Sequence, residues 1–135
     1  MKKFSWVAYG LLLLGIATGG CGDDGKLKRY PVTGVITYPY GTPIHNLVVL
    51  FRSDEHDVRA RARTLEDGSY RLSTYEKNDG AVAGKHHILV MPWMKPDGTP
   101  GLSIHPKFGQ FRTSGLEFQV EPVGKNEFYF KVEKR

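Results

Sequence analysis

The sequence predicts an all-β fold, a seven-stranded antiparallel β-sandwich that follows an N-terminal signal peptide. Three observations support this prediction. From Tyr30 onward, apolar and polar residues alternate with the period of two that is typical of half-buried strands. The 16 Gly and 8 Pro residues favour many turns between short strands. No segment shows the 3.6-residue period of an amphipathic helix, and 135 residues suffice for one domain with a modest core.

Residues 1–20 predict a lipoprotein signal peptide. A positively charged start at residues 1–3 precedes an apolar run over residues 4–17. That run is shorter than the ~20 residues that span a bilayer. Small residues then lead to Cys21, which resembles the lipobox of bacterial lipoproteins, where the cysteine is lipidated. Thr18 departs from this pattern, which prefers an aliphatic residue at its position.

Cys21 is the only cysteine, which excludes an internal disulfide and a multi-cysteine zinc site. Several acyl chains on one cysteine anchor a protein stably. Residues 21–29 are polar and charged and predict a flexible tether. We therefore expect an exported protein, lipid-anchored to a bacterial membrane in the periplasm or at the cell surface. An uncleaved signal anchor, or an ordinary signal peptide with an incidental cysteine, is the alternative.

The seven strands follow from the alternation. They are predicted at residues 32–38, 47–51, 59–63, 69–73, 86–90, 116–120 and 128–132. In the second strand, Leu47, Val49 and Phe51 share one apolar face. The dipeptide Asp67-Gly68 predicts a hairpin turn between the third and fourth strands.

Two adjacent histidines lie in the fifth predicted strand. Neighbouring residues of a strand point to opposite faces, so His86 and His87 do not readily ligate one metal. By alternation, His86 shares the core face with Ile88, and His87 points outward. We expect His86 to be a buried structural residue.

The order of several short segments resembles a known family. These segments are YPVTGVITY (30–38), GTPI (41–44), Val49 and Phe51, DGSYRLSTY (67–75), DGAVAG (79–84), TSGL (113–116) and GKNEF (124–128). Together they resemble the small lipoproteins of planctomycete-type bacteria that carry a transthyretin-like, carboxypeptidase-regulatory-like β-sandwich. The resemblance implies a transthyretin-like (prealbumin/Ig-like) domain over residues 30–135, a surface location and no known activity. Some transthyretin-like proteins are hydrolases with a C-terminal Tyr-Arg-Gly-Ser tail, which the end of this chain at Arg135 lacks.

Three arginines form the sharpest electrostatic feature. Arg59, Arg61 and Arg63 recur at the strand period and line one face at a spacing of about 7 Å. Such a stripe can bind carboxylates, phosphates or sulfates. The alternative is a solvated strand face whose charges protect a sheet edge from aggregation. For an exported protein we expect an anionic glycan or a lipid head group as the partner, and no nucleic acid.

The connection over residues 92–114 is longer than most loops, and long loops are often functional. Among its residues, Trp93, His105, Phe108 and Phe111 are possible ligand-binding residues, because aromatic side chains in a surface loop suit a partner or a sugar ring. Equally, the loop can fold back as a lid on one end of the sandwich. The family resemblance at residues 104–108 favours the lid.

The sequence therefore predicts a non-enzymatic, lipid-anchored module of the cell envelope with a structural or protein-interaction role. The alternative is a binding module for anionic polysaccharide that uses the arginine stripe and the aromatic loop. A hydrolase is less favoured, since neither a Gly-x-Ser-x-Gly elbow nor a His-Glu-x-x-His motif occurs. We predict no catalytic residue, metal or cofactor. The predicted partners are the membrane, through lipidated Cys21, and envelope proteins or an anionic glycan.

Overall fold

The computed structural model describes residues 25–135, so the predicted signal peptide and Cys21 lie outside the described residues. The fold is all-β, as predicted. Its elements are β1 (Arg29–Tyr30), β2 (Val32–Thr37), β3 (Leu47–Ser53), β4 (Arg59–Arg63), β5 (Ser69–Arg71), β6 (Ala81–Val82), β7 (Gly84–Pro92), the 3₁₀ helix η1 (Pro106–Gly109), β8 (Leu116–Val120), β9 (Asn126–Glu127) and β10 (Phe130–Lys131). Within residues 25–135, no helix is long and apolar enough to span a membrane.

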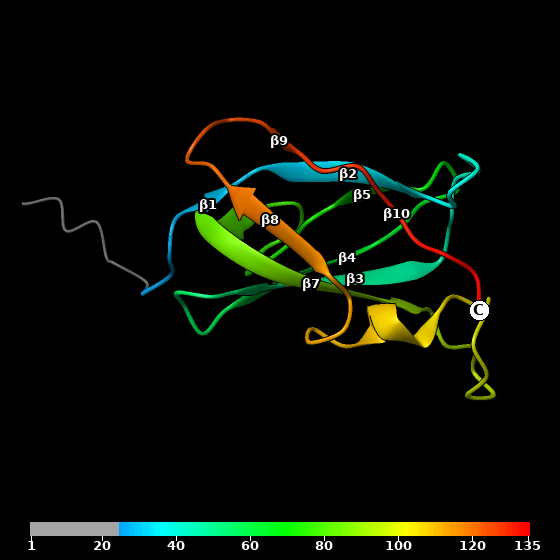
Figure 1. Ribbon diagram of the computed structural model, residues 1–135. Helices are drawn as coiled ribbons and strands as arrows, with labels where there is room; N and C mark the ends of the chain where they lie inside the picture. Colours follow the sequence, from blue (N-terminus) through cyan, green and yellow to red (C-terminus); the bar gives the residue numbers. More distant parts are fainter. Residues whose placement is uncertain (1–24) are drawn as a thin grey trace, which may run out of the picture.

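Two four-stranded sheets form the two layers of the domain (Figure 1). The first has the order β10-β2-β5, with β9 also paired to β2, and the second has the order β4-β3-β7-β8. In Figure 1 the β2 sheet lies above the β3–β7 layer, and η1 lies below it. A separate two-stranded ladder joins β1 to β6.

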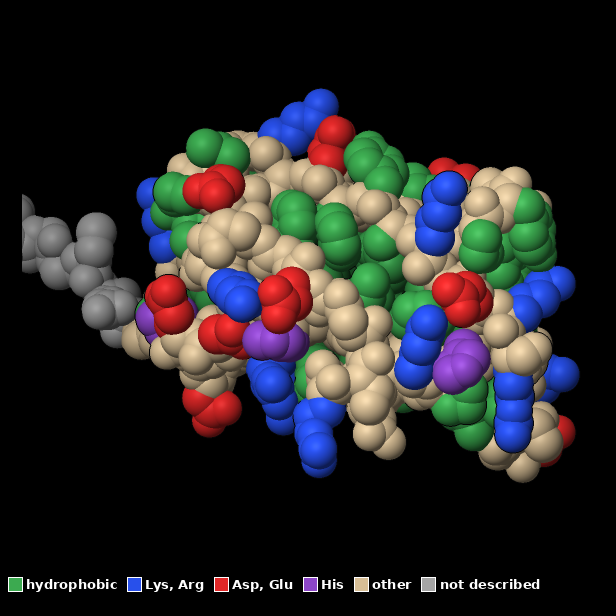
Figure 2. Space-filling view, in the orientation of Figure 1, with side chains coloured by type: hydrophobic (Ala, Val, Ile, Leu, Met, Phe, Trp, Pro, Cys, Tyr) green, Lys and Arg blue, Asp and Glu red, His purple; other side chains and the backbone are tan. Residues whose placement is uncertain are grey.

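The core follows the predicted alternation. Along β2 every second residue is buried, and along β3 the side chains of Leu47, Val49 and Phe51 are fully buried. On the side of the sandwich where β8 faces the last strands, the rings of Phe118 and Phe128 stack at 4.7 Å between centroids. Figure 2 shows hydrophobic side chains at the surface between the two layers. The inward faces of both sheets are apolar because burial of apolar side chains against the opposite sheet is the main driving force for folding.

The Asp67-Gly68 turn is present, and the predicted hairpin forms only in part. Gly68 has φ +76° and its N–H donates to the Leu65 carbonyl at 2.9 Å. The Leu65 N–H donates to the Ser69 carbonyl across the turn, and an isolated antiparallel bridge joins Arg61 to Ser73. However, β4 has its ladder with β3 and β5 has its ladder with β2. The turn chemistry specifies a reversal of the chain, whereas the apolar faces decide which sheet each strand joins.

The final predicted strand differs in two ways from the prediction. Within the predicted range 128–132 only β10 is a strand, and a further short strand, β9, precedes that range; both pair parallel with β2. Between them, the Phe128 N–H donates to the Thr33 carbonyl and the Phe128 carbonyl accepts from the Tyr70 hydroxyl at 2.7 Å. Parallel pairing is possible here because no tight turn joins β2 to these strands, and the rest of the sandwich separates them in the sequence.

The ordered domain begins before Tyr30. Arg29, the last residue of the predicted tether, lies in β1 opposite Val82. Its Nε is 3.0 Å from Oδ2 of Asp79, and its Nη1 donates to the Leu27 carbonyl at 2.9 Å. These contacts attach the end of the tether segment to the sandwich.

Candidate binding surface

The arginine stripe lies on the outer face of the β4-β3-β7-β8 sheet. Arg59, Arg61 and Arg63 are all exposed, whereas Ala60 between them is 2% exposed and part of the core. The local pattern of small and charged residues therefore orients β4, because only the alanine face fits against the other sheet. The cross-strand register places Arg63 opposite Val48 and Arg61 opposite Leu50.

A fourth arginine, which the sequence-based site omitted, extends this surface. Arg52 on β3 is exposed and lies directly opposite Arg59. Like charges at directly opposed positions of a sheet destabilise the pair. Among the described residues 25–135, neither arginine has an ion pair with a carboxylate. We call Arg52, Arg59, Arg61 and Arg63 the arginine face.

Two of these arginines stack on aromatic rings of the long loop. The guanidinium carbon of Arg63 is 4.1 Å from the ring centroid of Trp93, and that of Arg52 is 4.4 Å from the ring centroid of Phe111. Such cation–π contacts orient the guanidinium while leaving its N–H groups available. The structure thus brings two predicted aromatic residues to the arginine face.

Asn46 fixes the Arg63–Trp93 pair. Its side-chain oxygen accepts from Arg63 Nη2 at 2.8 Å, and its backbone carbonyl accepts from the Trp93 N–H at 2.8 Å. Asn46 has φ +59°, a left-handed conformation that asparagine tolerates better than most residues. Sequence reasoning missed Asn46, and its only signal was the position of an asparagine immediately before a strand.

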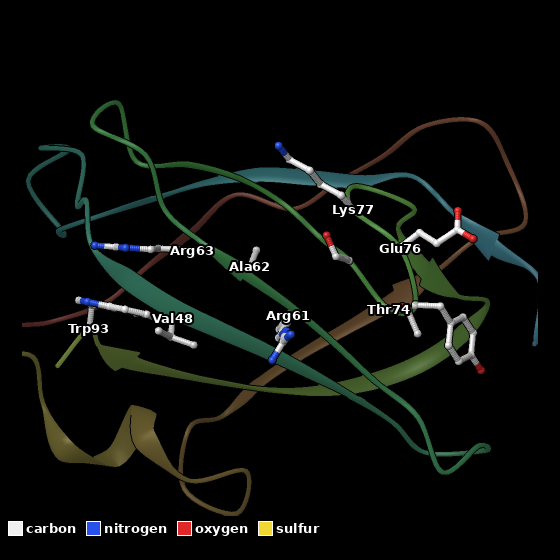
Figure 3. A pocket seen from close by; sticks show the side chains of 10 residues that line it. Val48, Arg61, Ala62, Arg63, Thr74, Glu76, Lys77 and Trp93 are labelled. Atoms are coloured by element: carbon white, nitrogen blue, oxygen red, sulfur yellow. The ribbon is translucent and has the colours of Figure 1, made fainter.

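A hollow of about 630 Å³ lies beside β4. Its lining residues are Val48, Arg61, Ala62, Arg63, Ser73, Thr74, Tyr75, Glu76, Lys77 and Trp93. Figure 3 shows Arg63 and Trp93 side by side at one end, Thr74 and Glu76 at the other, and Arg61 between them. We call this hollow the β4 groove. Its Tyr75 and Lys77 come from the loop after β5, which no sequence motif connected with the arginines.

A second hollow of about 220 Å³ adjoins Arg52 and Phe111. His87 in its lining has Nδ1 at 2.6 Å from Asp54 Oδ1 and Nε2 at 3.0 Å from Glu117 Oε1. Lys85 Nζ is 3.2 Å from another oxygen of Glu117. His87 points outward as predicted, and each of its two ring nitrogens contacts a carboxylate oxygen.

His86 occupies the core, as predicted. It is 1% exposed, and its Nδ1 lies 3.0 Å from the Gly84 carbonyl. Burial lowers the pKa of His86 below its ordinary value and outweighs the opposing effect of that hydrogen bond. A neutral ring between apolar neighbours suits a structural role.

The structure removes Phe108 from the candidate site. Phe108 is 4% exposed and belongs to the hydrophobic core together with Ile104, so it offers no surface to a ligand. His105 is exposed, but it lines neither hollow, and its Nδ1 accepts from the Lys107 N–H at 3.1 Å at the start of η1. From the long connection, Ile104 and Phe108 therefore pack into the core, while Trp93 and Phe111 lie at the arginine face.

No family model and no curated protein matches the sequence. Among solved structures, the domain is similar to the crystal structure of BcpA, the major pilin subunit of Bacillus cereus, with a TM-score of 0.52 and 9% sequence identity. The match covers 80% of this chain and 31% of the pilin chain, so it concerns only part of the pilin subunit. What the likeness shows is the fold, an all-β sandwich similar to part of that pilin subunit.

Proposed function

We propose that this chain is a non-enzymatic module of the cell envelope, held to a membrane by lipid on Cys21, which acts through contacts of the arginine face. The observation that carries the proposal is the cross-strand pair of Arg52 and Arg59, which have no carboxylate partner among residues 25–135. A partner of opposite charge would offset the repulsion between them.

Protection of a sheet edge accounts for part of this surface only. β4 ends its sheet, so its three arginines suit that role. Arg52, however, lies on β3, which is paired on both sides by β4 and β7. Because an inner strand has no free edge, the exposed charge of Arg52 supports an interaction surface.

The location is supported by the signal sequence and the lipobox-like segment before Cys21. A β-sandwich similar to part of a pilin subunit is compatible with a structural role at the cell surface, although the likeness concerns the fold alone.

The test compares the full chain with Cys21→Ser in a bacterial host. The unchanged chain should enter the membrane fraction and gain the mass of a lipid, and the variant should lose both. Crosslinking in intact envelopes, followed by purification, should recover an envelope partner with the unchanged chain. It should fail with Arg52→Gln/Arg59→Gln. If Cys21→Ser stays in the membrane pellet and neither protein carries lipid, the anchoring proposal is wrong. Equal recovery with the arginine variant would contradict the role of the arginine face.

A second candidate is binding of an anionic polysaccharide. The specific observation in its favour is the stacking of Arg63 on Trp93 and of Arg52 on Phe111. Cation–aromatic pairs combine a donor for carboxylate or sulfate with an amphipathic ring surface.

A further inference from the structure

We propose that the β4 groove is the binding site for a linear acidic polysaccharide whose sugars carry carboxylates. This inference rests on the proposed function, since it names the partner class and the place of binding.

The charge of the groove favours an anionic ligand. Arg61, Arg63 and Lys77 line it, against a single carboxylate, that of Glu76. The Glu76 carboxylate is already 3.8 Å from Lys26 Nζ. Arg61 has no ion pair within residues 25–135, so its planar guanidinium is available for a bidentate contact with a carboxylate.

The groove is arranged before any ligand binds. Arg63 is held between the Trp93 ring and the Asn46 amide. On the other wall, the Asp79 carboxylate accepts from the backbone N–H groups of Thr74, Tyr75 and Glu76. Because these groups are already ordered, binding loses less conformational entropy of the protein, which favours affinity.

Aromatic rings favour a sugar over a simple anion. Trp93 is 45% exposed at one end of the groove, and Tyr75 is 38% exposed beside Thr74 and Glu76 at the other. Both rings combine an apolar surface with a polar group, a combination that suits the apolar faces and hydroxyls of sugar rings. The volume of about 630 Å³ is within the usual range of ligand pockets and far exceeds one inorganic anion.

The arginine stripe favours a polymer over a single sugar. Arg59 continues the line of Arg61 and Arg63 beyond the groove, at a spacing of about 7 Å along β4. A ligand with repeated charges can contact all three side chains, whereas a single small acid cannot.

The test uses fluorescence of Trp93. The chain has two tryptophans, and Trp6 lies in the predicted signal peptide, so Trp6→Phe in the full-length chain in detergent leaves Trp93 as the sole reporter whether or not that peptide is removed. The ligand probe is polygalacturonate, with neutral dextran, poly-glutamate and inorganic phosphate in parallel titrations. Polygalacturonate should change the emission and bind less tightly as salt rises, and dextran should not bind. Arg61→Gln and Arg63→Gln should each weaken binding about tenfold, the effect of losing one charge-assisted hydrogen bond.

Arg71→Gln is the matched control. Arg71 is an exposed arginine on β5 in the other sheet, and it does not line the groove. Its replacement should leave the affinity unchanged. If Arg71→Gln weakened polygalacturonate binding as much as Arg61→Gln and Arg63→Gln do, binding would depend only on the net charge of the protein, and the inference would be wrong. Tighter binding of poly-glutamate would assign the groove to an acidic protein, and a response to phosphate alone would assign it to a small anion. If no polysaccharide binds while crosslinking still recovers an envelope partner, the groove inference is wrong and the proposed function stands.

Discussion

At the scale of single residues, Asp79 orders one wall of the β4 groove through its hydrogen bonds. Its two carboxylate oxygens accept from three consecutive backbone N–H groups, at 2.7 Å from Thr74, 3.1 Å from Tyr75 and 2.9 Å from Glu76, and from Arg29 Nε at 3.0 Å. Burial by itself would raise the pKa of Asp79, but these four hydrogen bonds together lower it below its usual value. The carboxylate form therefore stabilises the folded protein.

We expect Asp79→Asn to lower the free energy of unfolding by about 1–3 kcal/mol at neutral pH, because hydrogen bonds to a charged group are lost. Because the folded-state pKa is lowered, the contribution of Asp79 is fully present above its unfolded-state pKa of about 3.9 and is lost as the pH falls through the folded-state value. Urea unfolding at pH 7 and at lower pH should thus show a difference between variant and parent that shrinks in acid. Asp97 lies in an exposed turn, so Asp97→Asn should lower the free energy of unfolding at pH 7 by less than Asp79→Asn does. A difference that stays constant with pH would contradict this role of the carboxylate.

At the scale of elements, the last strand depends on a close approach to β2. A Cβ atom on Gly34 would lie 1.8 Å from the Phe128 carbonyl oxygen and 2.6 Å from the Tyr70 hydroxyl. Only glycine allows the chain between β9 and β10 to accept the Tyr70 hydrogen bond and donate to Thr33. A single missing side chain on β2 therefore determines where the final strand packs.

Gly34→Ala should accordingly destabilise the protein by about 3 kcal/mol, since backbone atoms must move to accommodate the methyl group. Hydrogen exchange should show the amides of Phe128 and Val132, which donate to β2 carbonyls, losing protection first. Gly124→Ala is the matched control, because a Cβ there has no neighbour within 4 Å, and its stability should change by less than about 0.5 kcal/mol. Equal stability of the two variants would contradict the close approach.

At the scale of the whole molecule, the long connection between β7 and β8 serves two different parts of the structure. Phe108 at 4% exposure completes the core, and η1 packs against β7. Trp93, at 45% exposure, stacks on Arg63 at the arginine face. The loop thus stabilises the domain at one point and builds the candidate site at another.

Phe108→Ala should lower the free energy of unfolding by about 3–5 kcal/mol, as truncation of a buried aromatic ring does, without changing polygalacturonate affinity at a temperature where the variant remains folded. Trp93→Ala should show the reverse, with a small loss of stability and weaker polysaccharide binding measured by co-sedimentation. Unfolding curves of both variants measure the loss of stability, and binding curves measure the change in polysaccharide affinity. Loss of binding in folded Phe108→Ala would contradict a purely structural role for this ring.

The sequence by itself determined the all-β class, the positions of most strands, the burial of His86 and the exposure of the β4 arginines. Each of these depends on a residue and its immediate neighbours, and alternation of side chains along a strand is a local property. Local patterns also located the Asp67-Gly68 turn correctly.

Only the tertiary structure decided what depends on contacts between distant segments. It assigned β4 and β5 to different sheets, paired β9 and β10 parallel with β2, and placed Phe108 in the core. It also placed Arg52 opposite Arg59, and Asn46 and Tyr75 around the β4 groove. These arrangements arise because both sheets bury their apolar faces in one shared core, so each strand takes the partner that this burial requires, whatever its local turn allows.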